Sequence, residues 1–132
     1  MKKIVFTKNT EEKKNNIFPD DYYDVKNHTT FINQLYLNQS YDYCEDIQKE
    51  ISRKVQGYIQ QDKKKDRIDR FITVEQTYEK LVCSQLKCKY CLCDLKLLYK
   101  IKKDEQQWTL DRIDNNLAHT YDNVIVSCLK CN

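Results

Sequence analysis

Two pairs of cysteines with the same spacing constrain the fold of this chain more than any other feature of its sequence. Cys88 and Cys91 form one Cys-x-x-Cys pair, and Cys128 and Cys131 form the other. Each pair can form a tight turn whose two sulfurs point at one ion, and four thiolates in a tetrahedral array are the ligands of a structural zinc site. We therefore expect one Zn²⁺ per chain, bound by all four cysteines. Such a closed ligand set stabilises a fold and does not catalyse.

The other three cysteines are Cys44, Cys83 and Cys93, and we interpret them as buried or incidental thiols. Cys83 and Cys93 flank the first pair, so either could replace one of the four predicted ligands. An odd total of seven cysteines and the lack of a long apolar signal region argue against a secreted disulfide framework. No stretch approaches the roughly 18 apolar residues of a membrane span. We expect an intracellular protein in a reducing compartment, without a membrane contact.

Composition and periodicity divide the chain of 132 residues into three segments. Residues 1–39 are polar and rich in Asn, Asp and Tyr, which predicts an irregular arm with room for short strands. Residues 40–72 form an amphipathic helical segment that ends in a basic run, residues 60–70, which includes Lys63, Lys64 and Lys65. This run is either a solvated helix end or a surface that contacts phosphates. Residues 73–132 form the zinc-bound domain.

Local patterns predict the helices and strands within these segments. Residues 40–58 carry an apolar stripe with helical spacing, and Ser40 is a suitable N-cap for that helix. Thr73 and Gln76 have the spacing of a capping box at the start of a second helix. Strands are predicted for residues 95–101, 108–113 and 124–126.

The block from Trp108 to Asn132 reads WTLDRIDNNLAHTYDNVIVSCLKCN. Together with the first cysteine pair, it resembles the ββα-metal core of the HNH endonuclease superfamily in its zinc-stabilised form. It is closest to HNH-like proteins of large DNA viruses and phages, which favours a viral origin. The resemblance covers roughly residues 73–132 and implies an α+β fold, with a helical N-terminal region before a small zinc-stapled ββα-metal domain. The sequence ends at Asn132, where the family continues, so we expect that domain to be truncated at its last helix.

The resemblance also implies roles for single residues. Asp111 would bind a divalent cation such as Mg²⁺ at the end of the first strand. Asn123 would fix the loop between the strands, and Asn132 would complete the site of that cation. The position of the general base holds Arg112, which stays protonated and cannot accept a proton from water. His119 could supply the base from across the loop, or it could merely brace the turn.

Three functions follow from these expectations. The leading hypothesis is an HNH-like, metal-dependent DNA endonuclease on a four-cysteine zinc scaffold. The second is a catalytically degenerate HNH fold that acts as a DNA-binding or structural, virion-associated module, in which Arg112 and the basic run contact phosphates. The third is a zinc-stapled assembly component whose protein partners bind the N-terminal arm. A net charge of +3 does not distinguish among them.

Overall fold

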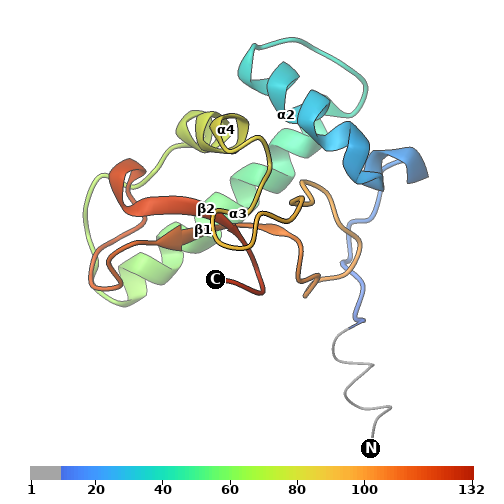
Figure 1. The fold of residues 1–132 in the computed structure, drawn as a ribbon. Coiled ribbons are helices and arrows are strands. Elements are labelled where there is room, and N and C mark those ends of the chain that lie inside the picture. The colour runs from blue at the N-terminus through green and yellow to red at the C-terminus, as the bar shows by residue number, and fades with distance from the viewer. Residues whose placement is uncertain (1–9) are drawn as a thin grey trace, which may run out of the picture.

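The structure is a computed structural model that describes residues 10–132. Its elements form a mixed α+β fold in which one long helix passes behind a two-stranded antiparallel sheet (Figure 1). The helices of this part of the chain are α2 (His28–Tyr36), α3 (Cys44–Lys64) and α4 (Val74–Cys83), and the strands are β1 (Trp108–Arg112) and β2 (Val124–Cys128). Three short 3-10 helices span Asp20–Tyr23, Val25–Asn27 and Tyr121–Asn123.

Helix α3 supplies the centre of the hydrophobic core. Ile47, Ile51 and Val55 lie one helical turn apart and are each no more than 1% exposed. Burying a side chain of this size stabilises the fold by about 1.5–3 kcal/mol. The next residue on this stripe, Tyr58, reaches the sheet, where its hydroxyl accepts a hydrogen bond from the backbone N–H of Leu110 at 3.3 Å. The predicted helical stripe is therefore confirmed, and it ties α3 to β1.

The start of α3 differs from the prediction. The helix begins at Cys44, not after Ser40, and its N-cap Tyr43 has a φ of 66°, in the left-handed region. The segment before it belongs to the connection from α2, because the hydroxyl of Tyr41 donates to the carbonyl of Phe31 at 2.8 Å. Ser40 therefore lies in a loop, where its capping propensity has no helix to act on.

The prediction of an irregular arm for residues 1–39 is wrong for residues 28–36, which form α2. Residues 1–9 lie outside the described residues. Helix α2 buries His28, Ile32 and Leu35, which have helical spacing. The pattern was obscured because it begins on a histidine and runs through polar residues of low helix propensity. Packing of α2 against α4 stabilises it instead.

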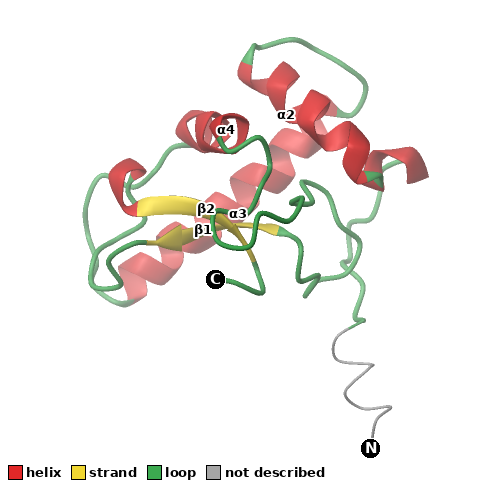
Figure 2. Ribbon diagram, viewed as in Figure 1, coloured by secondary structure: helices red, strands yellow, loops and turns green. Residues whose placement is uncertain are grey.

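The connection from α4 to β1, residues 84–107, is drawn as loop throughout (Figure 2). The predicted strand over 95–101 is wrong: in the described part of the chain this segment makes only isolated bridges, Lys96 with Gln107 and Ile101 with Glu12. Leu97 and Leu98 are both buried although they are consecutive, so the segment does not present one face to the core as a paired strand does.

The capping box and the other two strands are confirmed. The Thr73 hydroxyl accepts from the backbone N–H of Gln76, and the Gln76 side chain accepts from the backbone N–H of Thr73. Strands β1 and β2 pair with Asp111 opposite Ile125. The sheet thereby places Asp111 at the end of β1, beside the loop that leads back to β2. Within residues 10–132, no helix has the length and apolar character needed to cross a membrane.

Candidate metal centre and active-site pocket

The four cysteines of the two pairs converge on one point. The sulfur atoms of Cys88, Cys91, Cys128 and Cys131 all lie within 4.8 Å of one another, and those of Cys91 and Cys128 are 3.8 Å apart. A tetrahedral zinc with metal–sulfur distances of about 2.3 Å has sulfur–sulfur separations of about 3.8 Å. The group can therefore hold a metal ion.

Two similar turns and one strand bring these cysteines together. The N–H of Leu92 donates to the carbonyl of Cys88, and the N–H of Asn132 donates to the carbonyl of Cys128, each at 3.0 Å. The N–H of Lys89 donates to a carbonyl of β2, which fastens the first turn to the strand that carries the second. Both first cysteines of the pairs are buried.

Backbone N–H groups prepare Cys88 to act as a thiolate ligand. Burial raises the pKa of Cys88, but hydrogen bonds from the backbone N–H groups of Cys91, Cys128 and Tyr90 outweigh this and lower it to about 6. Cys93 is different, because burial raises its pKa to about 12. Neither Cys93 nor Cys83 belongs to the group of four, so the predicted ligand set needs no replacement in this geometry.

A second site lies where β1 ends. A cavity of about 330 Å³ there is lined by four of the five predicted catalytic residues, Asp111, Arg112, His119 and Asn132, together with residues of α3 that include Lys54 and Tyr58. Asp111 and Arg112 come from β1, His119 from the loop before β2, and Asn132 from the turn after Cys131. The metal centre and this cavity are thus adjacent along the chain but use different side chains.

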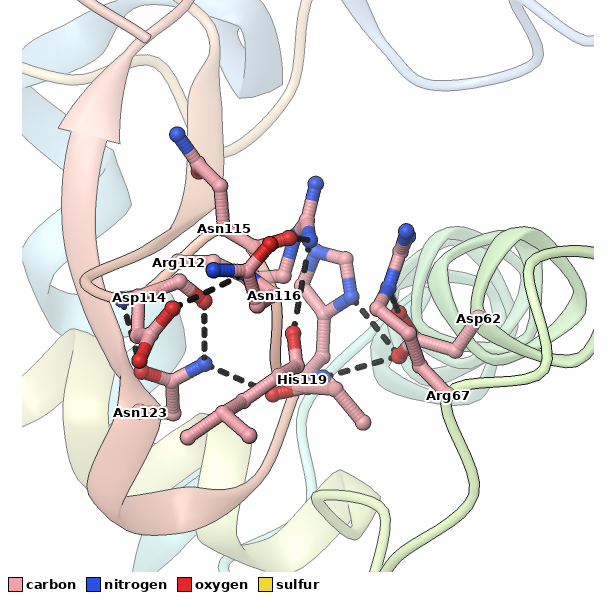
Figure 3. A network of polar contacts seen from close by, with 10 residues as sticks. Asp62, Arg67, Arg112, Asp114, Asn115, Asn116, His119 and Asn123 are labelled. Carbon is pink, nitrogen blue, oxygen red and sulfur yellow. Dashed lines mark hydrogen bonds and ion pairs between the residues drawn. The ribbon is translucent and has the colours of Figure 1, made fainter.

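His119 lies deep in this site and has a specific partner. It is 3% exposed, and its Nδ1 lies 2.9 Å from Oδ2 of Asp62 at the end of α3 (Figure 3). The imidazole ring also stacks on the ring of Tyr58, with 4.7 Å between centroids. Burial lowers the pKa of His119 against the opposing effect of Asp62, so the imidazole is neutral near pH 7. A neutral imidazole has one nitrogen that can accept a proton.

Arg112 acts as a brace for the loop. Its guanidinium donates from Nη1 to the carbonyls of Asn115 at 2.5 Å and Leu117 at 3.3 Å. Figure 3 shows these contacts at the centre of the polar network. The arginine therefore lines the cavity with a fixed positive charge and supports the backbone that leads to His119.

Asn123 lies outside the cavity, and its side chain forms hydrogen bonds to the loop between β1 and β2. Its Oδ1 accepts from the N–H of Asp114 at 2.9 Å, and its Nδ2 donates to the carbonyls of Asp114 and Ala118 at 3.0 and 2.9 Å. The Asp114 carboxylate accepts from the N–H of Asn116, which forms an Asx turn. One asparagine side chain thus holds the start and the middle of the loop between the strands.

Sequence reasoning does not single out Asp62, because it lies within the basic run. A usable signal was present, since Asp62 continues the stripe of α3 one turn beyond Tyr58 and seven residues beyond Val55. A carboxylate on the buried face of a helix is rarely tolerated without a partner. That position therefore pointed to a buried polar contact.

Comparisons with models of known protein families, with curated proteins and with solved structures found no significant match to this chain.

Proposed function

We propose that this chain is an HNH-like endonuclease that hydrolyses phosphodiester bonds in DNA, on a scaffold stabilised by Zn²⁺ at the four cysteines. The observation that carries this proposal is the meeting of Asp111, His119 and Asn132 around one cavity, with the imidazole paired to a buried carboxylate. These residues come from separate parts of the chain, and their shared cavity is the arrangement that a hydrolytic site needs.

Phosphodiester hydrolysis requires a cation beside the phosphoryl oxygen and a base that takes a proton from water. The Asp111 carboxylate and the Asn132 amide oxygen would hold the cation, because oxygen ligands suit Mg²⁺. A bound divalent cation would supply Lewis-acid polarisation of the phosphate. His119 would take the proton of the attacking water, and the positive charge of Arg112 would face the scissile phosphate.

The proposed zinc has a structural role in this account. Thiolate ligands select zinc over hard cations such as Mg²⁺. Asn132 directly follows Cys131, so the second cysteine turn sets the position of a cavity residue. The exposed basic residues at the end of α3, Lys63, Lys64 and Lys65, lie next to Asp62 in the chain and would contact DNA phosphates near the cavity.

The Asp111→Ala variant tests the proposal. Wild-type protein should nick supercoiled plasmid with Mg²⁺ or Mn²⁺, and Asp111→Ala should abolish nicking without a change in zinc content, because the two proposed metals have separate ligands. Asp122→Ala is the matched control, since Asp122 is exposed, lies outside the cavity and should leave activity unchanged. If the wild type fails to cut the plasmid with any of several divalent cations, the endonuclease proposal is refuted.

One observation favours the second function, a catalytically degenerate HNH fold that binds DNA or a protein partner. The position where the resemblance expects a base holds Arg112, and its donors are directed at loop carbonyls. A DNA-binding protein of this kind would retard DNA in a gel, less so at higher salt concentration, and would never cut it. The plasmid assay and a binding assay at several salt concentrations separate the two functions.

A further inference from the structure

We propose that Asp62 is a positioning residue that orients His119 as a proton acceptor in the cavity. This inference rests on the proposed function, because it assigns a partner to the proposed base. Asp62 itself does not line the cavity and is fully buried behind the imidazole. It would act only through His119.

The contacts of Asp62 converge on the histidine. Its Oδ2 accepts from both the backbone N–H of His119, at 2.8 Å, and the ring Nδ1, at 2.9 Å. Its Oδ1 accepts from Nε of Arg67 at 2.9 Å. Asp62 and His119 are 57 residues apart in the sequence, so the fold brings the carboxylate to the loop that carries His119. Figure 3 shows the carboxylate between the histidine and the arginine.

The place of Asp62 in α3 is unfavourable for a merely structural acid. It lies in the last turn of the helix, where the macrodipole is negative and cations are preferred. Burial also disfavours the charged form of a carboxylate. Hydrogen bonds from His119 and Arg67 overcome the effect of burial and keep the pKa of Asp62 below its ordinary value. The site thus maintains an ionised carboxylate at a position where both the helix macrodipole and burial disfavour the negative charge.

An ionised carboxylate fixes the tautomer of the imidazole. It can only accept hydrogen bonds, so Nδ1 of His119 must carry the proton and Nε2 must carry the lone pair. Stacking on Tyr58 restricts the orientation of the ring. When Nε2 takes a proton from water, the resulting imidazolium lies against the Asp62 carboxylate, which stabilises the charge. The other charged groups around the ring are Arg67 and Arg112, and both oppose protonation.

The Asp62→Asn variant separates positioning from loop anchoring. The amide oxygen can take the place of Oδ2 and still accept from both the backbone N–H and Nδ1 of His119, but the negative charge is lost. The measurement is the tautomer and pKa of His119 by ¹⁵N NMR in the zinc-loaded full chain, together with the pH profile of plasmid nicking. The variant should therefore keep the Nδ1–H tautomer, but it should lower the pKa of His119 and reduce nicking by ~10²–10⁴-fold. Asp66→Asn is the matched control, because Asp66 is exposed in the same segment.

An unchanged pKa of His119 and an unchanged pH profile in Asp62→Asn would overturn the inference. The NMR measurement does not require cleavage, so it decides the role of Asp62 even if the endonuclease proposal fails. Arg67→Ala provides a second variant should Asp62→Asn not fold. It keeps the carboxylate and removes a nearby cation, so the Nδ1–H tautomer should persist and the pKa of His119 should rise. Loss of the Nδ1–H tautomer in Arg67→Ala, or no rise in the pKa of His119, would also overturn the inference.

Discussion

His28 lies in the middle of the core, where a titratable side chain must be fully paired. It is buried, its Nε2 donates to the carbonyl of Tyr22 at 2.8 Å, and its Nδ1 accepts from the N–H of Leu97 at 3.0 Å. This ring joins the start of α2 to the long loop before β1. Burial lowers the pKa of His28, because a second ring proton would have no acceptor and would remove the bond from Leu97.

The pH dependence of stability should reveal this residue. The pKa of histidine in an unfolded chain is ~6.5, whereas burial lowers the pKa of His28 in the folded protein. The unfolded state therefore binds more protons in mild acid. The free energy of unfolding should therefore fall as the pH drops below about 6.5, by up to about 1.4 kcal/mol per pH unit for this group. Denaturant titrations at several pH values measure it. His28→Gln can keep both hydrogen bonds without titrating and should show a shallower slope; an equal slope would contradict this account.

At the residue scale, sequence reasoning succeeds where chemistry depends on spacing and fails where it depends on distant contacts. The two cysteine pairs could be predicted because each forms a local turn. Asp111 could be named from a motif and His119 as the imidazole nearest to it in the sequence, and the structure places both on one cavity. The pairing of His119 with Asp62 could not be predicted, since it depends on the packing of the end of α3 against the loop.

At the element scale, α3 both builds the core and supports the site. Its buried stripe begins with Ile47 and ends with Asp62, so one helix face passes from apolar packing to the polar contact with His119. Periodicity predicted this helix because its apolar residues are regularly spaced. Periodicity failed for α2, whose stripe includes His28, and for residues 95–101, whose alternating leucines have no partner strand among residues 10–132.

Helix α4 offers a test of local capping energy. Thr73→Ala removes the acceptor for the N–H of Gln76 and should lower the free energy of unfolding by about 1 kcal/mol, within a range of roughly 0.5–2 kcal/mol. Chemical denaturation of the zinc-loaded protein measures the change. Thr73→Ser keeps the hydroxyl and should remain close to the wild type. Equal stability of Thr73→Ala and wild type would show that the capping box contributes nothing.

At the scale of the whole molecule, one hydrophobic core joins the N-terminal and C-terminal segments. It extends from Phe18 to Cys128 and includes two of the cysteines of the metal centre. The chain of 132 residues has a limited core, and bound metal would add folding free energy to it. The proposed zinc therefore supports both the fold and the cavity at the end of β1.

Removal of the metal should unfold at least the C-terminal half of the chain. Elemental analysis should find one zinc per chain, and a chelator should reduce the cooperative unfolding signal, because ligand binding and folding are coupled. Cys128→Ser should lose the metal, whereas Cys44→Ser should retain it, since Cys44 lies outside the cluster. A metal-free protein that remains fully folded would exclude a structural metal.

The central claim is that the cavity beside β1 cuts DNA with His119 as base, while Arg112 braces the loop and faces the phosphate. Plasmid nicking by wild type, His119→Ala, Arg112→His and the double variant tests it most directly, with zinc content measured for each. The account predicts that the wild type cuts, that His119→Ala lowers the rate by ~10²–10⁴-fold, and that Arg112→His also lowers it. An inactive wild type, an unaffected His119→Ala, or a gain of cleavage in Arg112→His would contradict the account.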